Sequence, residues 1–314
     1  MVSRTGLCVF SLMFAFLLLP ISAAQNTLPP STHVYHRVPD IPTERTSLDV
    51  YPLKAGSRQP VVIFVHGGGW VQGDKANLQR APAFEGFFRD QELVLVSINY
   101  RLLMHEDSPS ATFRDQPTDV AAAVRWVRDN IAGYGGDPNR IFLLGYSAGA
   151  HIVALVGTDE RYLEQVGLSP ASLSGVISWD VSAYDIPRAV REGPDLGVPG
   201  ATVNLPRVFG SDPASQADAS PVNFVASGKS YPPFLVVYVG IFNTAPPPHE
   251  TQTLSKVQSE AFAEALTAAG GFARLYGEMD RTHTSLPRKF GTAGDGVTAE
   301  TQSFLTRFSQ EPDN

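Results

Sequence analysis

The fold is decided by the stretch Ile141-Phe142-Leu143-Leu144-Gly145-Tyr146-Ser147-Ala148-Gly149. Its first four residues are apolar and predict a buried strand, and the apolar run over residues 148–155 predicts a helix. The Gly-x-Ser-x-Gly string between them is typical of a nucleophile elbow, a sharp turn that holds a serine hydroxyl above the sheet. Small residues at 145 and 149 allow this turn to close. We therefore predict that Ser147 is a catalytic nucleophile.

A second glycine motif, His66-Gly67-Gly68-Gly69-Trp70, follows the apolar run Val61–Val65. One glycine is enough for a turn. Three in a row also let backbone N–H groups point into a small concavity, which stabilises a developing oxyanion. In such sites the other donor comes from the residue after the nucleophile. We therefore predict an oxyanion hole made of the N–H groups of Gly68, Gly69 and Ala148.

With these two motifs in the expected order, the chain resembles α/β-hydrolases of the esterase/lipase superfamily. It is similar to the group of hormone-sensitive-lipase-like, feruloyl-esterase-like and kynurenine-formamidase-like enzymes. Besides the motifs, the resemblance covers Ser47–Tyr51, Asn99–Leu102, Asp119–Asn130, Gly135–Ile141 and Gly270–Phe308. It implies a Ser-His-acid hydrolase of carboxylic esters, and it does not imply which ester.

The remaining pattern favours an α/β-hydrolase fold, because strand-like runs alternate with helical periodicity as in a mostly parallel sheet with helices on both faces. The predicted strands are Leu48–Tyr51, Val61–Val65, Leu93–Ile98, Arg140–Tyr146, Gly175–Trp179, Phe234–Val239 and Ala273–Tyr276. The predicted helices are Ala81–Asp90, Thr118–Ile131, Ala148–Val156, Leu254–Ala269 and Thr298–Phe308.

Residues 1–24 resemble a secretory signal peptide, with Arg4, an apolar run over residues 7–19 and small residues before Gln25. This run is short against the roughly 20 residues of a spanning helix, so cleavage is favoured over a membrane anchor. Cleavage would leave residues 25–314 as one domain and remove Cys8, the only cysteine. We expect a secreted or periplasmic protein.

Residues 181–225 interrupt the alternation of strands and helices. The segment is rich in Pro, Gly, Ser and Asp and has weak periodicity. An irregular stretch of this length in a compact domain is usually functional or flexible. It follows the predicted strand Gly175–Trp179, where such hydrolases often carry a lid. We expect a lid-like insertion that shapes the substrate pocket.

A nucleophilic serine requires a histidine that accepts its proton, and in this architecture the chain order is Ser, acid, His. His283 follows the last predicted strand and precedes the final helix, so we predict it as the base, with His249 as the weaker candidate. His66 precedes the glycine loop and is expected to brace it. His151 follows Ser147 by four positions on one helix face, which favours a packing role.

The acid departs from the family pattern. After the strand Phe234–Val239 the usual arrangement is Gly-x-x-Asp, but here Asn243 stands in the last position. Glu250 is the only carboxylate between residues 240 and 255, and Ser-His-Glu triads occur. We predict Glu250 as the acid. Asp180 and Asp185 after the preceding strand are alternatives, as is Asn243 with weakened catalysis.

The composition limits the classes of partner that we expect the protein to bind. The formal net charge is −7 without a basic cluster, which argues against nucleic acid and leaves a small-molecule ester as the expected partner. We expect no metal and no cofactor, because the chain has no His-x-x-x-His or cysteine cluster and neither phosphate-binding glycine motif. An amidase or formamidase on the same triad, and a non-catalytic ligand-binding protein motivated by Asn243, remain the competing functions.

Overall fold

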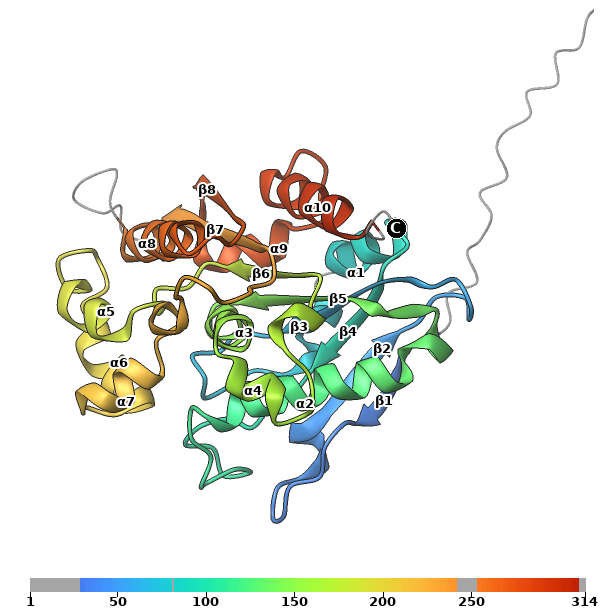
Figure 1. The fold of residues 1–314 in the computed structure, drawn as a ribbon, viewed down its shortest axis with the longest axis horizontal. Helices are drawn as coiled ribbons and strands as arrows, with labels where there is room; N and C mark the ends of the chain where they lie inside the picture. The colour runs from blue at the N-terminus through green and yellow to red at the C-terminus, as the bar shows by residue number, and fades with distance from the viewer. Residues whose placement is uncertain (1–28, 81, 242–252, 311–314) are drawn as a thin grey trace, which may run out of the picture.

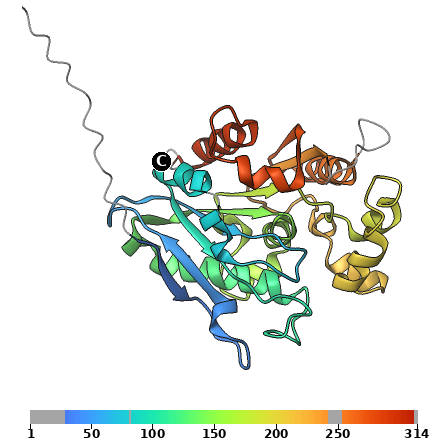
Figure 2. The same cartoon turned by 180° about the vertical axis from the view of Figure 1, so that it is seen from behind.

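The computed structural model describes residues 29–80, 82–241 and 253–310. Its centre is an eight-stranded sheet in the order β1-β2-β4-β3-β5-β6-β7-β8 (Figure 1). The strands are β1 (Ser31–Val34), β2 (Ser47–Tyr51), β3 (Gln59–Val65), β4 (Val94–Ile98), β5 (Gly136–Tyr146), β6 (Gly175–Trp179), β7 (Phe234–Ile241) and β8 (Ala273–Thr282). The first two pairings, β1 with β2 and β2 with β4, are antiparallel, and all the others are parallel. β1 and β2 form the edge opposite β8, as the view from behind also shows (Figure 2).

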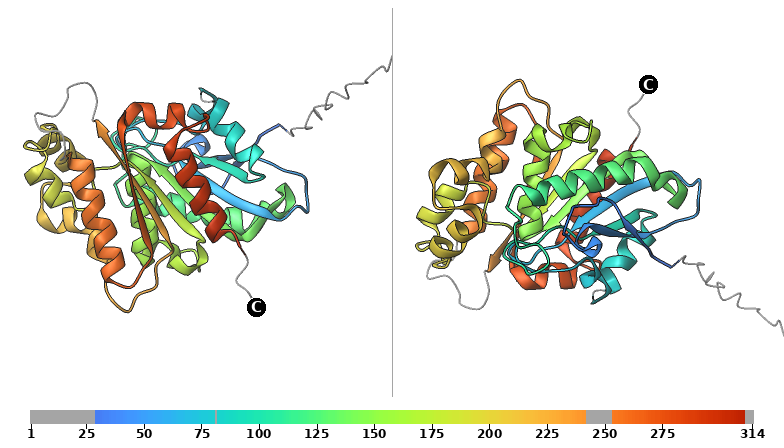
Figure 3. Two further views of the ribbon diagram at one scale, coloured as in Figure 1. Left: turned by 90° about the horizontal axis from the view of Figure 1, so that it is seen from above. Right: turned by 90° about the horizontal axis from the view of Figure 1, so that it is seen from below.

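Helices cover both faces of this sheet. On one face lie α2 (Asp115–Asn130), α3 (Ala148–Thr158) and α8 (Leu254–Ala268), and on the other lie α1 (Pro82–Asp90) and α10 (Gly296–Phe308). The other helices of the described ranges are α4 (Glu160–Glu164), α5 (Ile186–Glu192), α6 (Ala201–Phe209), α7 (Pro213–Asp218) and α9 (Leu286–Lys289). Figure 3 shows α10 in front of the sheet from above and α2 in front of it from below. The fold is therefore the predicted three-layer α/β arrangement.

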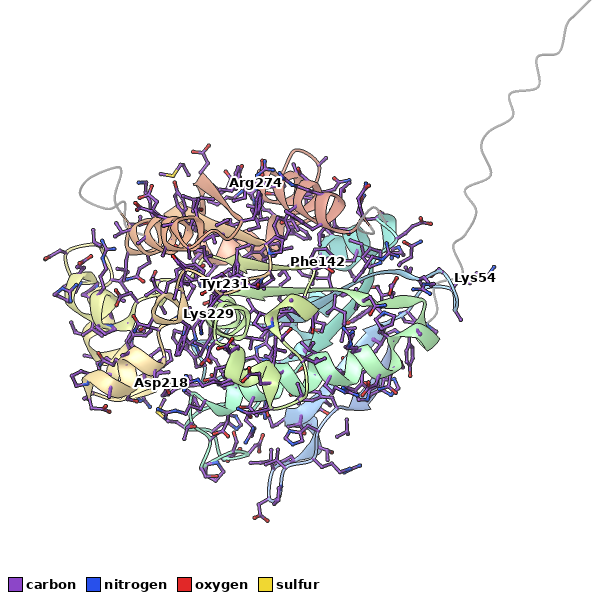
Figure 4. The ribbon with its side chains drawn as sticks, viewed as in Figure 1. Lys54, Phe142, Asp218, Lys229, Tyr231 and Arg274 are labelled. Atoms are coloured by element: carbon purple, nitrogen blue, oxygen red, sulfur yellow. The ribbon has the colours of Figure 1, made fainter. Side chains whose placement is uncertain are left out.

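The two layers follow from the two-residue period of a strand, which sends alternate side chains to opposite faces. In β3, Val61, Ile63 and Val65 join the buried cluster beneath α2, α3 and α8, whereas Val62 and Phe64 join the cluster beneath α1 and α10. Because both faces are buried, the strand is a continuous apolar run. Phe142 lies in the centre of the molecule on the α10 side (Figure 4).

The predicted strands and helices are all found, and three strands differ most from the prediction. β5 begins at Gly136, four residues before the expected start at Arg140. β1 was not predicted, because four residues without clear alternation carry little signal. β8 continues to Thr282, six residues past the expected end at Tyr276. The predicted signal segment 1–24 lies outside the described residues. Within the described ranges, none of the helices has the length and apolar character that crossing a membrane requires.

The segment 181–225 is more ordered than its composition predicts. It holds α5, α6, α7 and a 3-10 turn at Pro221–Phe224. Two of these helices begin at an aspartate cap followed within two residues by proline, a start signal that weak periodicity obscured. Asp218 at the end of α7 accepts hydrogen bonds from Arg114 and Arg161, which tie the segment to the body of the domain (Figure 4).

Candidate active site

Ser147 lies in the turn between β5 and α3 with φ of 56° and ψ of −121°, a left-handed conformation that non-glycine residues rarely adopt. Its N–H donates to the Trp179 carbonyl at 2.9 Å, and its own carbonyl accepts from the first turn of α3. The flanking glycines are required by space. A Cβ at Gly145 would lie 2.2 Å from the Gly149 oxygen, and one at Gly149 would lie 2.1 Å from the Val65 oxygen. Both glycines of the motif are therefore needed, because a side chain at either position would clash with backbone atoms.

His283 faces Ser147 from the start of the 3-10 turn His283–Ser285, directly after β8. Its Nε2 lies 2.9 Å from Ser147 Oγ. The imidazole stacks on the ring of Tyr146, with centroids 4.9 Å apart, and the Tyr146 hydroxyl donates to the His283 carbonyl at 2.8 Å. The residue before the nucleophile therefore orients both the ring and the backbone of the histidine.

Asp180 contacts the other nitrogen of this histidine. Its Oδ2 lies 2.5 Å from His283 Nδ1, and the residue is 1% exposed. The carboxylate also accepts through Oδ1 from the Val239 N–H at 3.2 Å and from the Ser255 hydroxyl. With these partners Nδ1–H donates to the carboxylate and Nε2 is left to accept from the serine hydroxyl.

The other candidates for the acid do not share this geometry in the described part of the chain. Asp185 caps α5, where its Oδ1 accepts from the Arg188 N–H at 3.0 Å. Glu250, Asn243 and the weaker base candidate His249 lie outside the described residues. Of the carboxylates that the structure describes, Asp180 is therefore the one on His283. The first-choice prediction, Glu250, stays a prediction.

Ser255 is a site residue that the sequence analysis missed. It is the second residue of α8, and only the fold brings that helix against the end of β6. Asp180 did carry a signal, because it directly follows a predicted strand whose carboxyl end meets that of the nucleophile strand. The signal was weak because Asp185 and Glu250 also follow strands closely.

The glycine loop lies beside Ser147 and is braced from below by His66, as predicted. His66 is buried, stacks on Tyr100 at 4.4 Å, and has Nδ1 2.7 Å from the Gly67 carbonyl. Burial lowers its pKa to about 4, so at neutral pH the ring is uncharged and Nδ1–H donates to this carbonyl.

Two of the expected oxyanion donors, Gly68 and Gly69, lie in this loop. The Gly68 carbonyl accepts from the N–H groups of Val71 and Gln72, which closes a tight turn. Within the described ranges, neither the Gly68 nor the Gly69 N–H has a hydrogen-bond acceptor, and both residues line one cavity with Ser147. Ala148 is the first residue of α3, so its N–H has no acceptor within the helix. The arrangement leaves N–H groups available for an anionic oxygen.

A chain of hydrogen bonds connects this loop to the segment 181–225 through His151. The Trp70 indole donates to His151 Nδ1 at 3.2 Å, and His151 Nε2–H donates to the Ala219 carbonyl at 2.8 Å. Burial lowers the pKa of His151 to about 4, which keeps the ring neutral and able to do both. His151 is thus a buried support beneath the elbow and does not face the cavity.

The cavity above Ser147 and His283 has a volume of about 1000 Å³. Its walls come from the glycine loop, from α6 of the segment 181–225, and from α1 and α9. Apolar side chains such as Trp70, Phe84 and Val208 line it beside polar ones. Across the described residues, no three His, Cys, Asp or Glu side chains are grouped so that they could hold a metal ion.

A serine within hydrogen-bond reach of a histidine at the carboxyl edge of a mostly parallel, helix-covered sheet defines the α/β-hydrolase class. A family model, BD-FAE, matches residues 48–256. The chain belongs to this BD-FAE family of the esterase/lipase α/β-hydrolase superfamily.

Relatives of similar sequence carry esterase names. The chain is 32% identical over 243 residues to esterase LipQ of Mycobacterium tuberculosis, covering 74% of this chain and 51% of that protein. It is 29% identical over 263 residues to isoprenylcysteine alpha-carbonyl methylesterase ICME of Arabidopsis thaliana, covering 77% of this chain and 54% of the other. The chain thus spans about half the length of these relatives.

Solved structures share the fold. Esterase B of Lactobacillus rhamnosis superposes with a TM-score of 0.67 at 22% identity, covering 90% of this chain and 86% of that one. The propionate-bound esterase Est2 of Thermogutta terrifontis gives 0.60 at 23% identity, covering 88% and 91%. At these identities the likeness supports the fold, which agrees with the sequence prediction.

Proposed function

We propose that the chain is a serine hydrolase that cleaves carboxylic esters through an acyl-enzyme, with Ser147, His283 and Asp180 as its triad. The observation that carries this proposal is the continuous contact from Asp180 Oδ2 to His283 Nδ1, at 2.5 Å, and from His283 Nε2 to Ser147 Oγ, at 2.9 Å. Membership of an esterase superfamily and the names of the relatives support it. In this proposal Asp180 takes the place that the sequence analysis gave to Glu250.

The geometry suggests the order of events. Ser147 Oγ attacks the ester carbonyl while His283 Nε2 takes its proton, and Asp180 stabilises the imidazolium that forms. The N–H groups of Gly68, Gly69 and Ala148 would hold the oxyanion. His283 returns the proton to the leaving alkoxide, and a water molecule repeats the sequence on the acyl-enzyme, releasing the acid.

An assay with 4-nitrophenyl acetate and labelling with a fluorophosphonate probe test this proposal. The parent protein should release nitrophenolate and carry one label, and Ser147→Ala should do neither. A chain that hydrolyses no ester and stays unlabelled would support the ligand-binding alternative. That alternative loses its motive if Asp180 supplies the carboxylate, because it rested on Asn243.

We also propose that residues 1–24 direct export and are removed. Only the sequence supports this step, through Arg4 and the apolar run over residues 7–19. Expression of the full chain in a bacterium, followed by N-terminal sequencing of the periplasmic fraction, should give a start near Gln25. Full-length protein that stays in the cytoplasm would contradict it.

A further inference from the structure

Two arginines line the catalytic cavity, and no described residue neutralises either of them. Arg207 comes from α6 and Arg288 from α9. Both side chains are exposed, and neither forms a hydrogen bond or an ion pair with any other residue in the described ranges. By contrast, Arg101, Arg161 and Arg188 each pair with a carboxylate.

The lining of the cavity has the opposite sign to the whole chain. The formal net charge of the protein is −7. Among the residues of the described ranges that line the cavity, however, two are arginines and none is Asp or Glu. A cleft lined by one sign of charge focuses the field and raises the local concentration of ligands with the opposite sign.

The two arginines lie on helices from different sides of the domain, α6 and α9 (Figures 1 and 3). Arg207 follows Asn204 by three positions on α6, so both side chains lie on the helix face that lines the cavity. This helix is held in place by Phe209, whose ring packs edge-on against Trp70 of the glycine loop at 5.0 Å.

Arg288 lines the same cavity as Ser147 and His283 and follows His283 by five positions in the chain. Burial and the Asp180 charge raise the pKa of Tyr146, and the Arg288 charge acts in the opposite direction. Tyr146 is the ring on which His283 stacks. An anionic group on a bound ester would therefore meet a positively charged lining.

We propose that the enzyme prefers esters that carry a carboxylate, bound by Arg207 and Arg288. The proposal rests on the proposed esterase function and names the substrate class. A guanidinium suits this role because it is always charged and presents paired N–H donors that match a carboxylate. The apolar walls of the same cavity accommodate the hydrocarbon part of the substrate.

The test uses two pairs of esters that share a carbon skeleton and differ in charge. One pair is mono(4-nitrophenyl) glutarate and 4-nitrophenyl pentanoate, which places the carboxylate on the acyl side. The other is 4-acetoxybenzoate and 4-acetoxybenzamide, which places it on the leaving group. For each pair the ratio of kcat/KM, anionic over neutral, is measured for the parent, Arg207→Gln, Arg288→Gln, the double variant and Lys289→Gln.

The expected ratio exceeds about fivefold for at least one pair in the parent, and the double variant should bring it near one. High salt should also reduce it, because exposed charges are screened. Lys289→Gln is the matched control: it removes one positive charge from the neighbouring residue of α9, which does not line the cavity. Its ratio should equal that of the parent.

Two outcomes would overturn the inference. One is a parent ratio at or below one for both pairs. The other is a preference for the anionic ester that survives in a folded double variant, with folding checked by thermal unfolding. Failure of the esterase function looks different, because neither neutral nor anionic esters would then be hydrolysed.

Discussion

Two turns at the carboxyl ends of neighbouring strands carry Ser147 and Asp180, the proposed nucleophile and the proposed acid, and their backbones are alike. Ser147 follows β5 with φ of 56°, and Asp180 follows β6 with φ of 53°. Each N–H donates to a carbonyl of the next strand, at 2.9 Å to Trp179 and at 2.8 Å to Val237. Only the serine turn is flanked by glycines, so only that turn is visible as a motif.

The difference reflects what each residue must do. The serine must stand exposed on a turn that leads at once into a tightly packed helix, and this fixes its sequence neighbours. The acid needs only to present a carboxylate to His283 Nδ1, and any strand end near that nitrogen can supply it. A residue whose conformation depends on its sequence neighbours, such as Ser147, is marked by a motif. A residue whose role depends on its distance to a group far away in the chain, such as Asp180, is not.

Among the substitutions around Ser147, Ser147→Ala should have the largest effect on kcat. Loss of the nucleophile leaves only the oxyanion donors and substrate binding, a drop in kcat on the order of 10⁶. The fold should persist, because the side chain makes its contact at the cavity and not in the core. Activity on 4-nitrophenyl acetate above a tenth of the parent value would refute the assignment.

Among the substitutions around Asp180, Asp180→Asn should have the largest effect on kcat. The amide keeps the size of the side chain and removes the charge that stabilises the imidazolium, so kcat should fall by roughly 10⁴. Glu250→Gln is the matched control, with the same change of carboxylate to amide, and should leave kcat within a few-fold of the parent. The reverse order of the two effects would restore Glu250 as the acid.

Gly68→Ala and Gly69→Ala are the same change at neighbouring glycines, but the structure predicts different effects on kcat. A Cβ at Gly68 would lie 1.9 Å from the Gln72 carbonyl oxygen, whereas one at Gly69 meets nothing within 4 Å. Gly68→Ala should therefore displace the donors and lower kcat by roughly 10²–10³. Gly69→Ala meets only backbone strain of about 1 kcal/mol and should cost less than tenfold. Equal losses in kcat would mean that the loop is not held as described.

The stability of the region around Ser147 should fall at acid pH, because His66 and His151 support this region as buried neutral rings. The pKa of each is lowered to about 4, so the unfolded chain binds more protons between pH 4 and the ordinary value near 6.5. Their contribution to stability is complete above pH 6.5 and is lost as the pH falls toward 4. It amounts to about 3 kcal/mol each.

Urea unfolding at pH 7 and pH 4.5 measures this contribution. His151→Gln should be less stable than the parent at pH 7, since the amide cannot fully replace the ring, but should lose less stability on acidification. An unchanged pH dependence in the variant would contradict the buried neutral state of His151.

Ser255→Ala should give a much smaller effect than Asp180→Asn. It removes the hydroxyl that donates to Asp180 Oδ1 and leaves the Val239 N–H in place. Loss of this hydrogen bond to a charged group should lower kcat by about tenfold. Ser259→Ala, one turn along α8 and also buried, does not touch Asp180 and should leave kcat unchanged. Equal losses in both would indicate a general disturbance of α8.

The fold could be predicted from the sequence almost completely, since apolar runs such as Val61–Val65 report burial on both sides of a strand. The contact between Ser147 and His283 agrees with their prediction, which rested on the glycines beside Ser147 and on the place of His283 after the last strand. The sequence alone could not establish the acid, because the candidates Asp180, Asp185 and Glu250 are all carboxylates that follow predicted strands. Distance to His283 separates Asp180 from Asp185, and chain order does not contain that distance.

Proton NMR of the His283 imidazole tests the central claim most directly. A short hydrogen bond to a carboxylate should shift the Nδ1 proton far downfield of the amide region, assignable with ¹⁵N-histidine. The account predicts that this resonance is present in the parent and in Glu250→Gln and is absent in Asp180→Asn. Its persistence in Asp180→Asn together with its loss in Glu250→Gln would contradict the account.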